Sequence, residues 1–462
     1  MNKWFASIGF FLAVAAIPAI TQNAPLPRGT VDIFPVHRAG TPLHPQTQAT
    51  PAQSGEANAS LTALVEEALQ KNPAVQSALR RVEAMRHRIR QAKSWPDPKV
   101  GVGWMGNATP FSVQHGDPSS YRGVQAMQTI PFPGKLGLRG NVAGKEAEAA
   151  SWDYEAVRRR VTADVKAAYF EYYFYEKAIQ ITQKNRDLLT KLSQIAEARY
   201  RVGKGIQQDV LKAQTELSLI MRRLTVLDQQ RQTAQARLNT LLSQSADATV
   251  AAPAELEPAV LAYSLDELYD LAQKNDPGLH RDEQVIQRDQ YAVNLAHKEY
   301  YPDLGIGYMY QQRPDMPDMH GVTFTVNIPI FYKSKQREAV KQAGDELLSS
   351  QAARQNRLNE VEFDVKQQYL EAQASQELIA LYAKGIVPQA SLALESSMSA
   401  YQVGKADFLT VLANFTNVLQ YQVEYYRELA NFETALARLE PRVGIELTSN
   451  RPQSPIVPKA QK

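Results

Sequence analysis

The stretches Arg199-Tyr-Arg-Val-Gly-Lys204 and Ala400-Tyr-Gln-Val-Gly-Lys405 mark equivalent points of an internal duplication about 200 residues long. Four further pairs of landmarks recur in the same order: residues 68–73 with 271–277, 95–97 with 301–303, 101–105 with 305–309, and 130–132 with 328–330. Chance does not keep five landmarks in one order, so the chain consists of two tandem repeats. Glycine reaches positive φ at little cost, which makes each Val-Gly-Lys a turn between two helices.

Proline sets the boundaries of the first two helices of each repeat. A short helix is expected at about 61–71 and again at 265–274, and Asn-Pro or Asn-Asp-Pro ends it. A second helix then runs to the residue before Trp95-Pro96 or Tyr301-Pro302, because the residue preceding proline disfavours the helical conformation.

Period-two alternation then predicts one pair of strands per repeat. In the clearest strand, Gly321, Thr323, Thr325 and Asn327 lie on one face and the apolar face carries Val322, Phe324, Val326, Ile328 and Ile330. Residues 100–105 and 305–308 alternate in the same way, and 124–130 does so more weakly. Aromatic residues cluster toward the strand ends, as at membrane interfaces. Four strands cannot close a membrane barrel alone, so closure would require several chains.

Each strand pair is followed by a long helical hairpin. The helical pattern continues from residue 134 to Val202, and from Ile330 to Val403, for about 65 residues or roughly 100 Å. The returning helices are expected at 207–242 and 407–439. Pro388 should kink the second long helix. Apolar residues in strict 4-3 spacing predict coiled-coil packing along the first long helix: Val161, Val165, Ala168, Tyr172, Tyr175 and Ile179, then Leu188, Leu192 and Ile195.

The chain ends and the composition indicate an exported protein. Residues 1–23 have the charge, apolar core and small residues of a signal peptide, and a Pro-rich extended segment follows at 24–59. The repeats then occupy 60–255 and 256–445, and 446–462 is expected to be a disordered tail. No further apolar stretch reaches the ~20 residues of a membrane helix. Cysteine is absent, which excludes disulfides, thiolate metal sites and lipidation on cysteine.

The residues offer little for catalysis or nucleic-acid binding. A net charge of +3 arises from 51 basic and 48 acidic residues without a long block of one sign, so no nucleic-acid partner is expected. Gly101-Val-Gly-Trp-Met-Gly106 spells a dinucleotide fingerprint, but it lies in an alternating strand and opens no helix. The seven histidines lack metalloprotease spacing, and no serine nucleophile elbow occurs. We therefore expect no enzyme activity, no cofactor and no resident metal site.

Methionine and histidine gather near the strands. Met316, Met319 and His320 share one loop, and thioether and imidazole groups suit soft ions such as Cu(I) or Ag(I). The arrangement suggests metal export, with loop packing and lumen lining as the alternative interpretation. The other residues of this group are Met105, His115, Met127 and Met309.

A chain with a signal peptide and two copies of short helix, strand pair, long helix, Val-Gly turn and returning helix resembles the TolC family of outer-membrane channels. The resemblance covers about residues 61–443, and the segments 199–214, 400–409 and 130–134 carry it most specifically. It implies a homotrimer with a 12-stranded β-barrel in the outer membrane and an α-helical tunnel in the periplasm. It also implies an inner-membrane pump and a periplasmic adaptor. The Ile-Pro-Phe-Pro-Gly134 turn is similar to that of the heavy-metal branch, which is served by RND pumps.

The resemblance places both Val-Gly turns at the periplasmic tip, where the adaptor docks and the tunnel closes. The docking residues would be Val202, Gly203, Lys204, Gly205, Val403, Gly404, Lys405 and Ala406. Relatives close the tip with an aspartate, a tyrosine and an arginine. Asp209 and Tyr401 match the first two, Ala406 stands at the arginine position, and Thr410 and Ala413 stand where relatives have an aspartate ring. The latch is thus carried over only in part.

Two alternatives remain at this point. The channel could serve heavy-metal or multidrug efflux, or type I protein secretion, because one channel fold serves all three. From another class of protein, a soluble periplasmic coiled-coil adaptor also has long helical hairpins. Such an adaptor would not carry amphipathic strands at matched places in two repeats.

Overall fold

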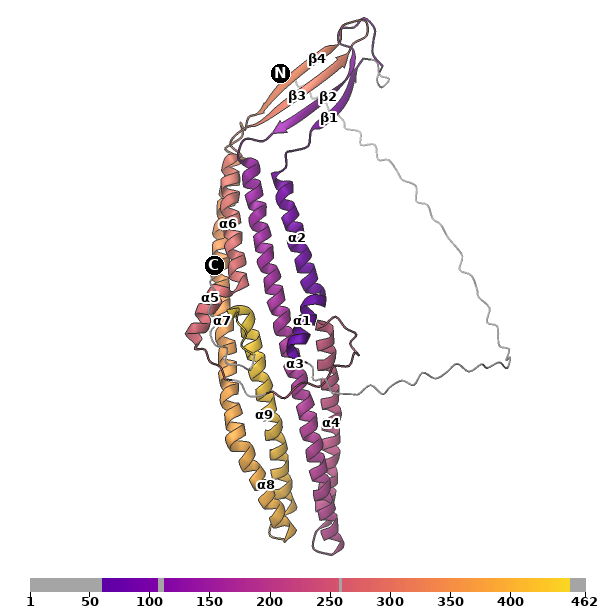
Figure 1. The fold of residues 1–462 in the computed structure, drawn as a ribbon, viewed down its shortest axis with the longest axis vertical. Coiled ribbons are helices and arrows are strands. Elements are labelled where there is room, and N and C mark those ends of the chain that lie inside the picture. Colours follow the sequence, from indigo (N-terminus) through magenta and orange to yellow (C-terminus); the bar gives the residue numbers. More distant parts are fainter. Residues whose placement is uncertain (1–59, 107–111, 257–259, 449–462) are drawn as a thin grey trace, which may run out of the picture. The chain divides into compact units, whose positions relative to one another are not determined.

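The computed structural model describes residues 60–106, 112–256 and 260–448. The expected signal peptide, the Pro-rich segment and the tail beyond Thr448 lie outside the described residues. Both repeats have the same order of elements (Figure 1). The first contains α1 (Leu61–Lys71), α2 (Pro73–Lys93), β1 (Lys99–Met105), β2 (Tyr121–Ile130), α3 (Lys135–Arg201) and α4 (Gln207–Leu241). The second contains α5 (Leu265–Asn275), α6 (Pro277–Lys298), β3 (Asp303–Gln312), β4 (Met319–Asn327), α7 (Gln336–Leu381), α8 (Val387–Gln402) and α9 (Phe408–Val443).

The long helix α3 is the centre of the helical part. It packs against α2 and α6 near the strands, and against α4 and α9 toward the turns (Figure 1). The predicted 4-3 stripe is buried at Val161, Val165 and Ala168. Residues 168–175 are buried at every position except Glu171, so here the helix is covered on more sides than a coiled-coil seam requires.

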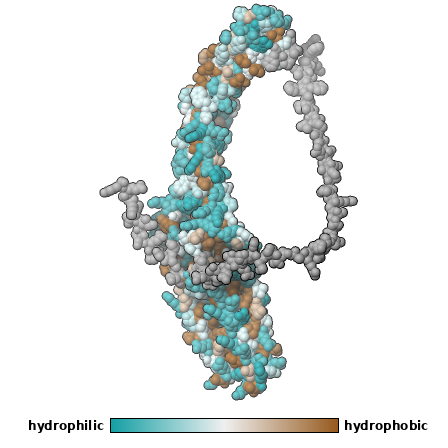
Figure 2. Space-filling model, turned by 45° about the vertical axis from the view of Figure 1, so that its right-hand side comes forward, coloured by the Kyte–Doolittle hydropathy of each residue, from teal (hydrophilic) through white to brown (hydrophobic). Residues whose placement is uncertain are grey.

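The four strands form one antiparallel sheet in the order β1-β2-β3-β4. The register places Val102 beside Val124, and Ile306 beside Phe324, on one face. Gly305 and Thr325 face each other on the other side. The apolar face is exposed in the single chain, and Figure 2 shows hydrophobic residues at the surface of the sheet. The four predicted strands are therefore confirmed, and the alternation is clearest in β1, β3 and β4, because Gln128 of β2 lies beside Ile306 on the apolar face.

The end of β4 differs from the prediction. The strand stops at Asn327, so Ile328 and Ile330 lie beyond it, although both remain exposed. Pro329 explains the stop, because it has no N–H to donate to a ladder. The Ile330 N–H instead donates to the Ile328 carbonyl at 2.9 Å. The following helix consequently begins only at Gln336, later than the sequence pattern predicted.

The repeated Lys-Asn motif joins the short helices to the end of the returning helix. The Asn72 side-chain amide donates to the Leu241 carbonyl at 2.9 Å, and Asn275 donates to the Val443 carbonyl at 2.9 Å. Both acceptors lie at helix C-termini, whose last carbonyls lack intrahelical partners. Asn72 also caps α2, whereas in the second repeat the additional residue Asp276 caps α6. In the second repeat the inserted Asp276 thus takes over the capping of the next helix, while Asn275 keeps the bond to the end of the returning helix.

A buried lysine fastens the two repeats to each other where strands meet helices. Lys135, at the start of α3, is 1% exposed, and its ammonium donates to Asp303 and to the Tyr301 carbonyl, both at 2.9 Å. It also contacts Glu299 at 3.1 Å. These acceptors all belong to the second repeat. The buried charge is compensated by hydrogen bonds, as a desolvated ammonium requires.

The predicted kink at Pro388 takes the form of a π-helical turn, Tyr382–Ile386, which joins α7 to α8. Proline lacks the N–H for an α-helical bond and its ring crowds the preceding turn. A π turn is one of the recognised ways in which a helix absorbs such a disturbance. The equivalent helix α3 has no such turn.

Among the described residues, no helix combines the length and apolarity needed to cross a membrane.

The sheet yields a test with a matched control. A Cβ at Gly123 of β2 would lie 2.1 Å from the Tyr310 carbonyl oxygen of β3, whereas a Cβ at Gly103 of β1 would meet nothing within 4 Å. We expect Gly123→Ala to force the two repeats' strands apart and to cost roughly 1–3 kcal/mol. Thermal unfolding of the purified protein should show a lower midpoint for Gly123→Ala than for Gly103→Ala. Equal midpoints would contradict the close approach of β2 and β3.

Candidate functional site at the two helical turns

The two Val-Gly-Lys turns have the same backbone geometry. In the first, the Gly203 N–H donates to the Tyr200 carbonyl at 3.0 Å, and the Lys204 N–H donates to the Arg199 carbonyl at 2.9 Å. In the second, Gly404 and Lys405 make the equivalent bonds at 3.0 and 2.8 Å. This pair of bonds defines a Schellman helix end. The glycines have φ of 72° and 80°, which confirms the predicted positive φ.

The two hairpins pack together next to the turns. Tyr401 is 2% exposed, and its ring lies 5.5 Å from that of Phe408, which is 1% exposed. Leu189 and Leu192 of α3 belong to the same apolar cluster, so residues about 200 positions apart share one core. This core fixes the second hairpin against the first.

Asp209 and Tyr401 meet as the sequence suggested. The Tyr401 hydroxyl donates to Asp209 Oδ2 at 3.2 Å, joining α8 to the first turn of α4. Burial, reinforced by the neighbouring carboxylate, raises the pKa of Tyr401 to about 12. The phenol therefore stays protonated and remains a donor at neutral pH.

Arg199 is a residue of this site that the sequence analysis missed. Its guanidinium donates to the carbonyl oxygens of Tyr401, of Gln402 at 3.1 Å and of Lys204 at 3.0 Å. The guanidinium carbon also lies 4.6 Å from the centre of the Tyr401 ring, within cation–π range. One side chain of the first hairpin thus holds the C-terminal turn of both α3 and α8.

The signal for Arg199 is a difference between the two repeats. The equivalent position of the second repeat holds Ala400, and the family resemblance pointed to an arginine only at the position of Ala406, on the hairpin of Tyr401. The structure brings the arginine from the opposite hairpin. A Cβ at Gly404 would lie 3.5 Å from Arg199 Nη2. The bare glycine thus leaves room for the Arg199 guanidinium beside the second turn.

The other predicted gate residues do not join this contact. Thr410 and Ala413 are exposed, and the Thr410 N–H donates to Asp407 Oδ1 at 2.7 Å as part of the α9 cap. Among the predicted docking residues, Val202 and Val403 are 68% and 70% exposed. Four further docking residues are also exposed: Gly203, Lys204, Gly404 and Lys405. Gly205 and Ala406 are partly buried. The apolar Ile206, 59% exposed, adds to this surface.

Three of the methionine and histidine residues near the strands, His115, His320 and Met309, have other side chains as partners. His115 Nδ1 lies 2.9 Å from Asp315 Oδ2, and His320 Nδ1 lies 2.7 Å from the Tyr308 hydroxyl. Within the described part of the chain, no three His, Cys, Asp or Glu side chains gather as a metal site would require. The Met309 sulfur accepts a hydrogen bond from Gln311 at 3.2 Å.

Comparison with known proteins finds a matching family and solved structures with the same architecture. The outer membrane efflux protein family model matches residues 64–244 and 268–444, one match for each repeat. VceC of Vibrio cholerae has 19% identity, coverage of 83% of this chain and 96% of that chain, and a TM-score of 0.71. CusC has 15% identity, coverage of 84% and 92%, and a TM-score of 0.70. The open-state MtrE channel of Neisseria gonorrhoeae has 15% identity, coverage of 83% and 88%, and a TM-score of 0.70. No curated protein matches the sequence.

Two tandem repeats of a strand pair and a long helical hairpin thus define the fold of an outer-membrane channel protein. The match over both repeats identifies the family, and the chain belongs to the outer membrane efflux proteins. The TolC-family resemblance and the predicted fold class are confirmed by these findings.

The contacts of Arg199 lead to a prediction about local stability. We expect Arg199→Gln to remove donors from three carbonyl oxygens and to loosen both turns. Amide hydrogen exchange in residues 400–406 should become about tenfold faster, which corresponds to the loss of one or two net hydrogen bonds.

Arg201→Gln is the matched control, because Arg201 is two residues away and its side chain is 71% exposed. Among the residues that the structure describes, it pairs only with Glu197. Its exchange should stay at the wild-type rate. Identical rates in the two variants would show that Arg199 does not hold the turns.

Proposed function

We propose that the chain is one subunit of a trimeric channel that conducts the substrates of a tripartite efflux pump through the outer membrane. The sheet carries this proposal. In the described structure β1 and β4 each pair with a single strand, so both edges remain open. The sheet also exposes an apolar face that includes Val100, Phe324 and Val326. Open edges next to an apolar face invite pairing with further copies, and three copies would supply twelve strands to one barrel.

Cysteine cross-linking tests this arrangement, since the chain has no native cysteine. Val102→Cys on β1 should be combined in turn with Val322→Cys, Phe324→Cys and Val326→Cys on β4. We expect at least one pair to give a covalent trimer in the outer-membrane fraction after oxidation. Val102→Cys with Ile306→Cys is the control, because β3 already lies between β2 and β4. Recovery as uncross-linked protein in the soluble periplasm would reject the channel.

The helices would then form the periplasmic tunnel, with the two turns at its inner end. The exposed Val202, Val403 and Ile206 beside Lys204 and Lys405 offer an apolar surface with a basic border. A periplasmic adaptor of complementary shape fits this surface. The docking residues predicted from the sequence are proposed here for the same role, with Ile206 added.

The same end would hold the gate. Asp209 and Arg199 of the first hairpin hold Tyr401 of the second, and widening the tunnel requires the two hairpins to separate. We propose these three residues as the latch. Thr410 and Ala413 are uncharged, so the aspartate ring of relatives has no counterpart at these positions.

Single-channel recording tests the latch. We expect Tyr401→Phe to raise the resting conductance, because the variant loses the hydroxyl that binds Asp209, and we expect Arg199→Gln to raise it further. Tyr200→Phe is the control, since Tyr200 occupies the equivalent position of the first repeat and is 45% exposed. Resting currents that match the control in both variants would argue against the latch.

The proposed pump is of the RND type, and the proposed cargo is a heavy-metal ion or a drug. Support for metal comes from the Met-rich strand region and the Ile-Pro-Phe-Pro-Gly134 turn. Type I protein secretion is the alternative within transport. Family membership argues against the alternative of a periplasmic adaptor. The proposed location is the outer membrane, with the helices in the periplasm and without a lipid on cysteine.

A further inference from the structure

A groove rich in arginine lies where five helices meet: α2, α3, α6, α7 and α9. Its volume is about 750 Å³. Its charged lining consists of six arginines and four aspartates: Arg81, Arg160, Arg281, Arg357, Arg438, Arg442, Asp153, Asp164, Asp276 and Asp364. Arginine is therefore in excess, and its distribution among partners decides what the groove can bind.

Three of the arginines are neutralised by carboxylates. Arg442 binds Asp276 at 3.1 Å and Asp364 at 2.7 Å. Arg281 pairs with Asp153 at 3.6 Å and with Asp282, which adjoins the groove. Arg357 also pairs with Asp282. Every aspartate that lines the groove, except Asp164, therefore has an arginine partner.

The other three arginines are unpaired. Arg81 on α2, Arg160 on α3 and Arg438 on α9 are exposed and have no hydrogen bond or ion pair within residues 60–106, 112–256 and 260–448. Because α3 packs against both α2 and α9, Arg160 lies on the helix between the other two. Within the described residues, these three unpaired guanidinium groups face one unpaired carboxylate, that of Asp164. Even when the adjoining Asp282 is counted, six arginines face five aspartates, so a positive charge remains unbalanced.

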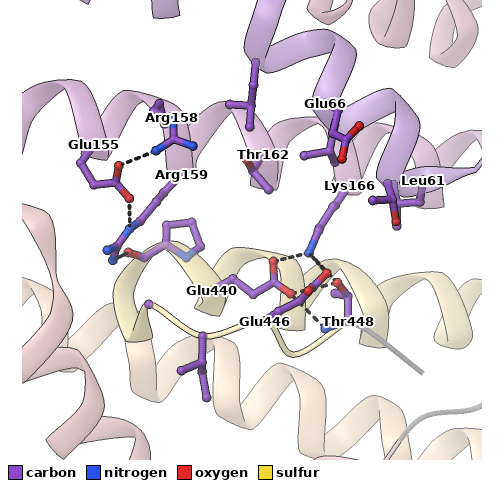
Figure 3. A pocket seen from close by; sticks show the side chains of 16 residues that line it. Leu61, Glu66, Glu155, Arg158, Arg159, Thr162, Lys166, Glu440, Glu446 and Thr448 are labelled. Atoms are coloured by element: carbon purple, nitrogen blue, oxygen red, sulfur yellow. Dashed lines mark hydrogen bonds and ion pairs between the residues drawn. The ribbon is translucent and has the colours of Figure 1, made fainter. Parts of the chain in front are cut away.

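The opposite side of α3 shows the contrast. A second cavity there lies beside α1, and its lining includes Arg158, Arg159 and Lys166. Figure 3 shows that these three cations have partners, with Glu155 bound to both arginines and Glu440 bound to Lys166. Arg158 and Arg160 are two residues apart, which turns them about 200° from each other around the helix. The three cations on the α1 side all have carboxylate partners, whereas three of the six groove arginines have none within the described residues.

The position of α1 indicates which side faces the tunnel. This short helix packs against α3 on the side of the second cavity, where Leu61 and Thr448 contribute to the lining. A conducting tunnel must remain open, so the side covered by the additional short helix is expected to face outward. The arginine groove then faces inward.

We propose that Arg81, Arg160 and Arg438 form an anion-binding station on the conduction path, repeated in each subunit. The proposal rests on the channel function above and deepens it, because it favours a drug with an anionic group over a metal cation as the cargo. Guanidinium groups bind carboxylate and phosphate oxygens through two parallel hydrogen bonds, so the ligands are substrates that carry such groups. Within the Debye length of about 8 Å at physiological salt, the same groups repel cations.

Ion selectivity in planar bilayers tests the station. Reversal potentials would be measured in a KCl gradient for the wild type and for the variant with Arg81→Gln, Arg160→Gln and Arg438→Gln. We expect the ratio of chloride to potassium permeability to fall by ~2-fold or more in the triple variant, because a cluster of like charges sets the local ion concentration. Since the three side chains have no partners in the described part of the chain, the variant should assemble like the wild type.

Arg158→Gln is the control, because it removes a positive charge from the other side of the same helix and leaves Glu155 bound to Arg159. Its permeability ratio should equal that of the wild type. A triple variant with an unchanged ratio, or one that changes no more than Arg158→Gln, would overturn the station while leaving the channel intact. A wild-type protein that conducts no current would instead refute the channel function.

Discussion

The burial of one helix governs this fold. Between Ala168 and Ala178, α3 carries aromatic or small side chains on nearly all sides, and residues such as Phe170 and Tyr173 are almost fully buried. A helix of this kind is stable only when neighbours cover it on several faces. The helices α2 and α6 cover it near the strands, and the returning helices α4 and α9 cover it toward the turns. Duplication of one hairpin unit supplies these neighbours from within a single chain.

The two repeats share a plan but perform different tasks. Asn72 and Asn275 bind equivalent helix ends, yet capping of the next helix passes to Asp276 in the second repeat. The counterpart of Arg199 in the second repeat is Ala400. The guanidinium contact at the turns therefore reaches only from the first hairpin to the second. A duplication that began with equal halves has therefore diverged where the halves touch.

Sequence signals that act over a few residues were sufficient to predict the helices, strands and turns. They were insufficient to predict the contacts between these elements. Proline, glycine and alternation predicted the helices, strands and turns, because each of these signals acts within a few residues. The contact of Arg199 with Tyr401 joins residues about 200 positions apart in the sequence, and no local pattern indicates which hairpin supplies the guanidinium. The early stop of β4 was readable from Pro329, but the strong apolar alternation through Ile330 concealed it.

The π-helical turn at Tyr382–Ile386 has a consequence for attempts to exchange the two hairpin tips. A π turn holds one residue more than an α turn, so all later positions are rotated by about 100° relative to an uninterrupted helix. Tyr200 follows the uninterrupted α3 and points outward, while Tyr401 follows the π turn and is buried. The rotational phase of each tip is thus set well before the tip itself. A chimaera that swaps only the Val-Gly-Lys segments would keep the original orientations.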